Sequence, residues 1–407
     1  MRAHYSAIAG LVLIYLIAGS ALSAQVQTRT DSNGVIRLLH IGKAWLTAGF
    51  PASMWIKDPR INWYPVPSHA WSMGEEAFRQ LRLYLPRTID VLRENFDVIV
   101  EDGMDASHLR PEFHEWMPIA VEEEGLGFLM ADDSSSFATS GRHTSWYLYP
   151  IGEVLPVSDV AQILREQHAY RIVPTPGNED HPLMRSIPWN EIKIWAHNRP
   201  DPKEGSVVLA KMSEEIIYNI GKPVLVYWDW GKGRSIAYVH KWGGSTPDFY
   251  RWKWGIDVLS HVIYFAARVD IPEDLELVHQ LRTLFNNFHF KRSYLISTMD
   301  FADKFGANLA DIEVELIDIN EEKKEADRLY IIQELIESEQ AMESVITDLD
   351  ALTLRVLDAK DRALFWIFMI EWLVVTGTSM FAGFMIWTLM VRRRLYKEVK
   401  VTRMVEL

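Results

Sequence analysis

Residues 96–131 read FDVIVEDGMDASHLRPEFHEWMPIAVEEEGLGFLMA and contain two short apolar runs. The runs FDVIVE (96–101) and GFLMA (127–131) have the length and apolar content of strands that are buried on both faces of a sheet. The stretch between them, from about 109 to 124, predicts a helix. Strand, helix and strand in this order are typical of an α/β fold, in which a helix connects parallel strands.

The same alternation continues on both sides of this stretch. Helices are expected at 75–95 and 252–268, and the turn DWGKGR (229–234) has the glycines that suit a tight antiparallel connection. Residues 33–270 are therefore predicted to form an α/β domain with a mostly parallel sheet between helices and a late antiparallel hairpin. The other expected strands are VIRLLHI (35–41), SVVLAK (206–211), PVLVYW (223–228) and SIAYV (235–239).

Composition excludes several classes of function. The 407 residues include 55 acidic and 42 basic side chains, a formal net charge of −13. Such a chain lacks the broad basic surface that a nucleic-acid-binding protein needs to neutralise phosphates. The chain contains no cysteine, which excludes disulfides, thiolate zinc sites, iron–sulfur clusters and a cysteine nucleophile.

Two segments predict a membrane protein. Residues 1–24 combine a basic start, a short apolar run and a small-residue exit, as in a signal peptide, or else form an uncleaved signal anchor. Residues 364–391 are apolar apart from Glu371 and are long enough to cross a bilayer, with Glu371 expected at the headgroup level. Residues 392–407 begin with three arginines, which predicts a cytoplasmic tail and a large domain outside the cytoplasm.

An acidic helical stalk is expected to precede the membrane segment. Residues 311–362 hold 16 acidic and 6 basic side chains without glycine or proline, and residues 271–310 form a helical connector before them. An apolar seam recurs every seven residues in this stalk. The seam either pairs subunits as a coiled coil or packs the helix against its own chain. Its residues are Leu335, Met342, Leu349 and Val356.

Four stretches of the exported part resemble a known family. They occur in the order found in the glutamine amidotransferase-like domains of bacterial exported and membrane proteins, within the class I glutamine amidotransferase-like superfamily. The resemblance extends over about residues 35–270 and implies a flavodoxin-like, three-layer fold. The stretches are EEEGLGFLMADDSSSF (122–137), EVLPV (153–157), HPLMRSIPW (181–189) and GKPVLVYWDWGKGRSIAYVHKWGG (221–244).

The resemblance does not extend to the activity. Active class I enzymes carry a cysteine on a turn after a central strand, and a histidine and a glutamate spaced by one residue on a later strand. Here the corresponding turn begins at Asp132 without a cysteine, and the histidine closest to the pattern, His240, is followed by Trp242 in place of glutamate. The lack of a thiolate therefore argues against glutamine hydrolysis, and the domain is expected to be a pseudoenzyme.

Polar side chains are nevertheless expected to gather at the carboxyl ends of the strands, where ligands of open α/β sheets bind. They could act as a hydrolase with Ser134 as nucleophile, or hold Ca²⁺ or Mg²⁺ as a cofactor. Alternatively, the acidic turn after 127–131 only caps the segment that follows it. The candidates for a ligand or ion pocket, or for catalysis, are Glu101, Asp102, Asp132, Asp133, Ser134 and His240.

Tryptophans crowd a long insertion, residues 44–73, between the first strand and the first helix. Long ordered loops are often functional. Their aromatic rings either fill the core, contact a partner protein or stack on sugar rings. The candidates for partner contact are Trp45, Trp55, Trp63 and Trp71.

The sequence as a whole predicts a single-pass membrane protein with an exported, amidotransferase-like domain. Its expected role is to bind or assemble a protein or an envelope component. The alternatives are a hydrolase acting on a carbohydrate or an amide, and a structural subunit of a membrane complex. The expected partners are the lipid bilayer and either another protein or a second copy of the chain joined through the stalk.

Overall fold

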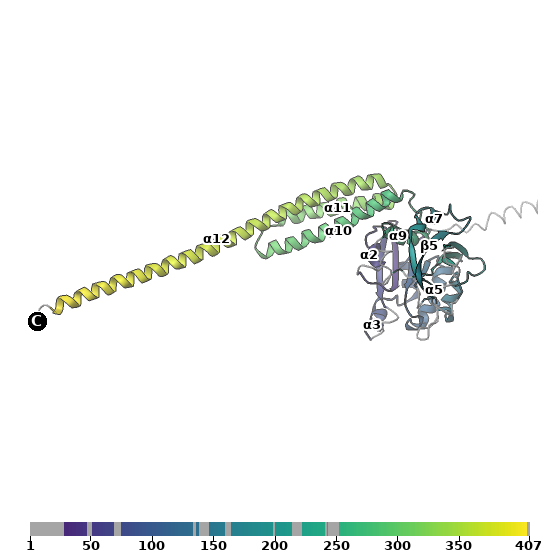
Figure 1. Ribbon diagram of the computed structural model, residues 1–407, viewed down its shortest axis with the longest axis horizontal. Coiled ribbons are helices and arrows are strands. Elements are labelled where there is room, and N and C mark those ends of the chain that lie inside the picture. The colour runs from purple at the N-terminus through teal and green to yellow at the C-terminus, as the bar shows by residue number, and fades with distance from the viewer. Residues whose placement is uncertain are drawn as a thin grey trace, which may run out of the picture. The chain divides into compact units, whose positions relative to one another are not determined.

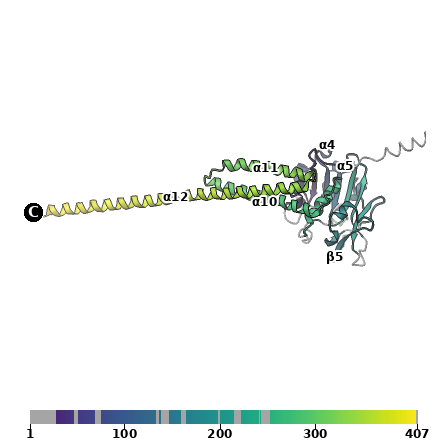
Figure 2. The same cartoon turned by 90° about the horizontal axis from the view of Figure 1, so that it is seen from above.

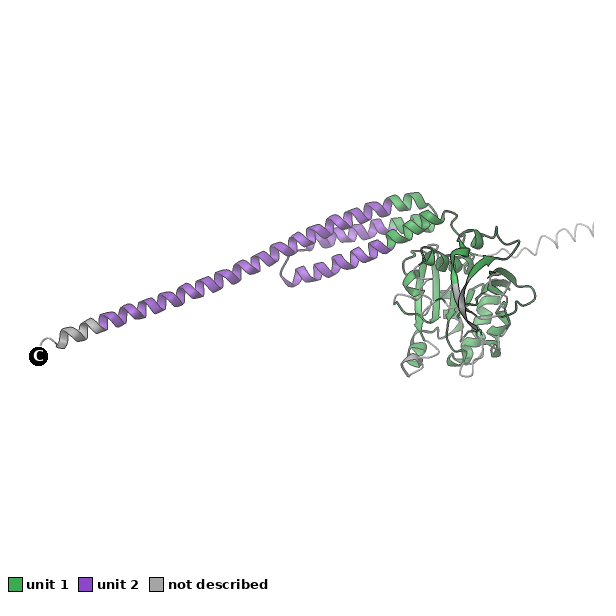
Figure 3. Ribbon diagram, viewed as in Figure 1, with its two compact units in different colours: residues 1–285, 325–340 green, residues 286–324, 341–407 purple. Residues whose placement is uncertain are grey.

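The computed structural model describes residues 28–46, 51–68, 75–132, 136–137, 146–158, 164–197, 200–213, 222–240, 242 and 252–404. The predicted signal segment 1–24 and the candidates Trp71, Asp133 and Ser134 lie outside these residues. The chain forms two compact units (Figure 3). The first contains residues 1–285 and 325–340, and the second contains residues 286–324 and 341–407.

Nine strands of the described residues form one sheet, in the order β2-β1-β3-β4-β9-β8-β7-β5-β6. In this order, the strands β2, β1, β3, β4 and β9 are each parallel to the next, as expected for the parallel part of the sheet. The strands β9, β8, β7, β5 and β6 are each antiparallel to the next and include the expected late hairpin, β8–β9. The strands are β1 Ile36–Gly42, β2 Ile61–Pro67, β3 Val98–Asp102, β4 Gly127–Ala131, β5 Leu164–Pro174, β6 Lys193–His197, β7 Val207–Met212, β8 Pro223–Trp230 and β9 Gly233–Tyr238.

The six strands expected from the sequence correspond to β1, β3, β4, β7, β8 and β9, whereas β2, β5 and β6 were not expected. Strand β2 lies within the insertion 44–73, so part of that segment belongs to the sheet and is not a loop. Its sequence INWYPVP contains two prolines, which argue against a central strand because proline cannot donate a hydrogen bond. The edge position of β2 tolerates them.

Helices cover both faces of the sheet (Figure 1). On one face, α9 packs through Val258 and Ile263 against alternate strand residues such as Val98, and all twelve residues of α9 are buried. On the other face, α5 packs through Phe113 against residues such as Ile99. The helices are α2 Ala52–Trp55, α3 Glu75–Tyr84, α4 Ile89–Asn95, α5 Pro111–Glu122, α6 Ile151–Val154, α7 Pro182–Arg185 and α9 Gly255–Ala266.

The helix expected at 75–95 is two helices, α3 and α4. Pro86 disfavours helical geometry at the residue before it, which ends the first helix near Tyr84. Thr88 begins the second, because its hydroxyl accepts a hydrogen bond from the backbone N–H of Val91 at 3.3 Å.

Three long helices follow the α/β domain: α10 Leu275–Lys304, α11 Ala310–Ile331 and α12 Leu335–Met404. The predicted stalk 311–362 is therefore divided between two helices, because the chain turns at Ile332–Glu334, where Gln333 has φ 65°. Within the second unit the three helices run side by side, as Figures 1 and 2 both show. Helix α12 continues without a break from the stalk into the apolar segment.

The apolar seam of the stalk packs within its own chain, which is one of the two alternatives expected from the sequence. Met342, Leu349 and Val356 are fully buried, and Leu335 is half-buried. A side chain without exposed surface cannot also contact a second subunit unless the helices separate. The seam therefore joins the helices of one chain, and pairing of subunits would need another surface.

Of the helices in the described residues, one has the length and composition to cross a membrane. It is the segment Leu335–Tyr396 of α12, and none of its most apolar window is buried within the chain. Large apolar side chains such as Trp366, Trp372 and Phe381 are between 64% and 71% exposed.

Candidate functional site

The carboxyl ends of β1, β3 and β4 meet where the chain reverses its direction across the sheet. The chain passes from β1 to β2 on one side and then crosses back to β3 on the other side of β1, so the direction of the connections reverses between β1 and β3. Crevices at such switch points bind ligands in open α/β folds. The register pairs Gly42 with Asp102 and Asp102 with Ala131, which brings the residues that follow the three strands to the same edge.

A buried ion pair lies at this edge. The ammonium Nζ of Lys43, just after β1, is 2.6 Å from Oδ1 of Asp132, just after β4. The same ammonium is 3.8 Å from Oδ1 of Asp102 at the end of β3. The aspartate side chains have no exposed surface and that of Lys43 is 4% exposed, so one ammonium faces two carboxylates out of contact with water.

Two glycines allow this close approach. Gly42 has φ 116°, and a Cβ there would lie 2.1 Å from the carbonyl oxygen of Asp102. Gly103 has φ 71°, and a Cβ there would lie 2.5 Å from Oδ2 of Asp132 and 2.6 Å from Nζ of Lys43. Any side chain at Gly103 would therefore occupy the space in which Lys43 and Asp132 meet.

Glu101 is a third buried carboxyl group at the site. Its Oε1 accepts a hydrogen bond of 2.5 Å from the backbone N–H of Met104. Burial raises the pKa of Glu101 well above its ordinary value, and the neighbouring charges of Asp132 and Asp102 raise it further, against the opposing effects of nearby Ser136 and of the hydrogen bond from Met104. The site therefore combines an acid that retains its proton above the usual pH range with two carboxylates paired to a lysine.

Replacing Glu101 with glutamine is expected to stabilise the protein as the pH rises. Because the folded-state pKa of Glu101 is raised, its contribution to stability is full below the unfolded pKa of about 4.3 and is lost as the pH rises through the folded pKa. Glutamine resembles the protonated acid and does not ionise. Between the unfolded-state and the folded-state pKa of Glu101, the free energy of unfolding of the variant relative to the unaltered protein should rise by about 1.4 kcal/mol per pH unit.

Urea unfolding between pH 5 and 9 measures this difference, with the exposed Glu123→Gln as the control. If the free energies of unfolding of Glu101→Gln and of the unaltered protein differ by a constant amount across this pH range, Glu101 ionises normally in the folded protein.

His40 of β1 connects the site with the tryptophans of the insertion. Its Nδ1 accepts a hydrogen bond of 3.1 Å from Nε1 of Trp63 in β2. A neutral imidazole whose Nδ1 accepts must carry its proton on Nε2, and that atom lies 3.8 Å from Oδ2 of Asp102. Trp55 packs edge-on against the same ring at 5.0 Å.

Two of the tryptophans expected to contact a partner therefore support the interior of the site. Trp55 has no exposed surface and also packs against Trp242, so it fills the core and is not available to a partner. Trp63 is half-buried and bonded to His40. Trp45 is also half-buried, and its role as a partner contact stays a prediction.

His240 follows β9, which is parallel to β4, so the two strands end at the same edge as the sequence predicts. His240 is buried beside Tyr238, with ring centroids 6.0 Å apart. Trp242, in the position where active enzymes have glutamate, is also buried and packs on Tyr238.

No three His, Asp or Glu side chains of the described ranges are arranged to hold a metal ion. Among the strand-end carboxylates, Lys43 lies in contact with Asp132 and near Asp102, and so places an ammonium where a cation would bind. Lys43 was not among the residues expected at this site from the sequence. The only signal for it was its position, directly after a buried strand, which it shares with the acidic residues that were included.

The family comparison agrees with this architecture. Residues 101–264 match the family described as "Putative glutamine amidotransferase". This segment is a glutamine amidotransferase-like domain. The match begins at Glu101, near the end of β3, and includes β4 and the β8–β9 hairpin. It lies within the resemblance predicted for about residues 35–270 and does not include residues 35–100.

Other comparisons are more distant. A search of the curated proteins found no match. Two cytoplasmic proteins of Salmonella typhimurium are similar in structure, with TM-scores of 0.47 and 0.46, identities of 19% and 16%, and coverage of 57% of this chain and 99% of theirs. A carbohydrate deacetylase, Agd3, has a TM-score of 0.33 and 12% identity over 50% of this chain and 29% of its own. We draw no conclusion about activity from these likenesses.

The amidotransferase-like domain lacks the groups that hydrolyse glutamine in active members of the superfamily. No residue of the chain is a cysteine, and Asp132 at the start of the turn after β4 is held by Lys43. A carboxylate paired to a buried ammonium at 2.6 Å is a weak nucleophile, because the ion pair stabilises it in the ground state.

Proposed function

We propose that the protein is a single-pass membrane protein whose amidotransferase-like domain lies outside the cytoplasm and binds or assembles a protein or an envelope component. The observation that carries this proposal is the buried pair of Lys43 and Asp132 at the position where an active enzyme needs its nucleophile. The domain retains the fold and the buried strand ends, while Asp132 is bonded to Lys43.

The membrane part of the proposal is supported by the C-terminal half of α12. Residues 364–391 correspond to roughly 40 Å of helix, which is about the thickness of a bilayer with its headgroup layers. Arg392, Arg393 and Arg394 follow directly, and such clusters remain in the cytoplasm. The α/β domain and the bundle, which precede this segment, would then lie on the opposite side of the membrane.

Two measurements on the full-length protein in mild detergent test the binding role. Incubation with glutamine should release no more ammonia than buffer alone, because there is no thiolate to form the acyl intermediate. The mass by light scattering should exceed that of a 47.1 kDa monomer after subtraction of detergent, with a second chain in a fixed ratio. A lone monomer, or ammonia release that persists on further purification, would contradict the proposal.

A second function, acid–base hydrolysis of a carbohydrate or an amide, is favoured by one observation. Within the described residues, neither side-chain oxygen of Asp102 accepts a hydrogen bond, and the neighbouring Glu101 has a raised pKa. A proton-bearing acid beside a carboxylate with free acceptor positions could serve as general acid and base. Hydrolysis of any such substrate that is lost in both Glu101→Gln and Asp102→Asn would establish this function in place of the binding role.

A further inference from the structure

Ion pairs between the helices of the second unit show which residues of α12 lie beside the turn between α10 and α11, residues 305–309. Nζ of Lys291 in α10 forms an ion pair with the carboxylate of Asp350 in α12, at 2.6 Å from Oδ2. Helices α10 and α12 run in the same direction in the second unit (Figure 2). Thirteen residues separate Lys291 from Lys304, and the same number beyond Asp350 leads to Ala363.

A second ion pair, which involves α11 on the other side of the turn, places the turn beside the same part of α12. Arg355 of α12 pairs with Glu315 of α11, which runs in the opposite direction. Six residues before Glu315 is Leu309, at the end of the turn, and six residues after Arg355 is Asp361. Both registers therefore place the turn beside residues 361–364, where the apolar segment of α12 begins.

Aromatic side chains are concentrated at this height. Phe365 and Trp366 of α12 are 58% and 64% exposed, and Phe301, one turn before the end of α10, is 45% exposed. Phe301 packs on the half-buried Phe305 with ring centroids 4.8 Å apart. Aromatic rings at the end of an apolar span are typical of the headgroup layer of a membrane, where their apolar bodies avoid water.

We propose that the turn at 305–309 rests in the outer headgroup layer of the bilayer, with Phe301 of α10, Phe305 of the turn, and Phe365 and Trp366 of α12 as one interfacial aromatic cluster. The proposal rests on the proposed membrane span of α12. The occupant of this surface is lipid because the surface is continuous with the segment that would enter the bilayer. The bundle would then contact the membrane at two adjacent points, which restrains the tilt of α12.

The position of the apolar segment is consistent with this contact. A hydrocarbon core of about 30 Å needs roughly 20 residues, so the 28 residues of 364–391 also extend through the headgroup layers. Leu364 then lies at the outer limit of the headgroups, beside the turn. Helix α10 meets the membrane by its end in this arrangement and does not lie along the surface.

The absence of cysteine from the chain makes a direct test possible, since each introduced cysteine is a single labelling site. The full-length variants Phe305→Cys, Phe290→Cys and Met380→Cys are labelled with an environment-sensitive fluorophore and placed in phosphatidylcholine vesicles. Phe290 is the matched control, because it is an exposed phenylalanine of α10 about 22 Å further from the membrane. Met380, which is 74% exposed, reports on the span itself.

Lipids with a spin label on the headgroup should reduce the fluorescence at position 305 about twofold and leave that at position 290 unchanged, given a headgroup layer only about 5–7 Å deep. Lipids with the spin label in the acyl chain should quench position 380. Quenching at 380 without quenching at 305 overturns the proposed contact and leaves the span intact. Equal quenching at 305 and 290 also overturns it, because the bundle would then lie along the membrane. No quenching at 380 contradicts the span and the contact together.

Discussion

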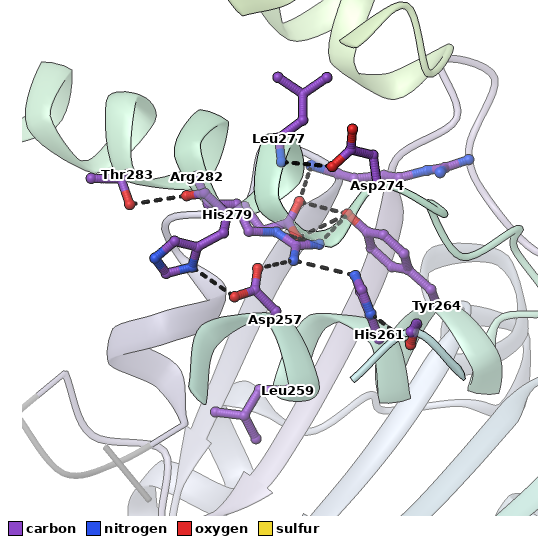
Figure 4. A network of polar contacts seen from close by, with 12 residues as sticks. Asp257, Leu259, His261, Tyr264, Asp274, Leu277, His279, Arg282 and Thr283 are labelled. Carbon is purple, nitrogen blue, oxygen red and sulfur yellow. Dashed lines mark hydrogen bonds and ion pairs between the residues drawn. The ribbon is translucent and has the colours of Figure 1, made fainter. Parts of the chain in front are cut away.

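Replacing Arg282 with methionine is expected to lower the free energy of unfolding by about 3–5 kcal/mol, because two buried carboxylates lose their cation. The guanidinium has no exposed surface. It lies 2.9 Å from Oδ2 of Asp58 and 2.6 Å from Oδ1 of Asp257 (Figure 4 shows the latter). The network also includes the hydroxyl groups of Tyr264 and Tyr330, which both lie within hydrogen-bonding distance of Arg282.

The charges of this network are compensated only when Arg282 is present. Burial by itself lowers the pKa of Arg282, but the tyrosines and aspartates around it raise that pKa well above its ordinary value, so it stays charged. Burial and the nearby guanidinium lower the pKa of His261 well below its ordinary value, which keeps the imidazole neutral. His279, bonded to Asp257 at 2.8 Å, remains half-buried and does not reach Asp58 in any described contact.

Chemical denaturation of the full-length protein in detergent measures the loss, followed by the fluorescence of the α/β domain. Arg185→Met is the matched control: Arg185 also forms an ion pair with a carboxylate at 2.8 Å, that of Glu273, but the two side chains are 58% and 84% exposed. Exposed pairs contribute about 0–1 kcal/mol. Similar losses for the two variants would mean that burial does not determine the strength of the Arg282 network.

Replacing Lys43 with methionine is expected to cost about 3–5 kcal/mol as well, because Asp132 and Asp102 would remain buried beside each other without their ammonium. Methionine retains most of the length and volume of the lysine stem, so packing changes little. The loss should appear as a lower denaturant midpoint with an unchanged slope.

The double variant Lys43→Met with Asp132→Asn separates the ion pair from the local packing. The double variant removes both charges of the 2.6 Å pair and leaves Asp102 as the remaining carboxylate near the lost ammonium, so it should recover a part, and not all, of the stability lost by the single variant. Lys222→Met, which removes a pair with Asp201 whose side chains are 38% and 77% exposed, is the control and should change stability by less than about 1 kcal/mol. A double variant as unstable as Lys43→Met alone would show that the unpaired charge of Asp132 does not cause the loss.

The proline-containing edge strand β2 is an element whose conformation only the tertiary structure decided. INWYPVP (61–67) has too many prolines for a central strand, and a loop was expected for the segment that contains it. The pairing of Ile61 with Ile36 at the edge of the sheet supplies the partner that decides its conformation. A single sequence contains no information on which strands lie at an edge.

The sequence by itself determined the parts of this protein that depend on local pattern or on the inventory of side chains. Short apolar runs predicted β1, β3 and β4, glycines between two runs predicted the β8–β9 hairpin, and a long apolar run predicted the candidate membrane segment of α12. The absence of cysteine predicted, without any structure, that the domain does not hydrolyse glutamine through a thiolate. These features need only neighbouring residues or a composition.

Only the tertiary structure decided which charged groups are buried together. Lys43 and Asp132 are 89 residues apart in the chain, and Arg282 and Asp58 are 224 apart. In the sequence each of them resembles an ordinary solvated charge. Their pairing depends on which strand ends and helix faces the fold brings into contact, and burial then makes that pairing strong because water no longer competes for the charges.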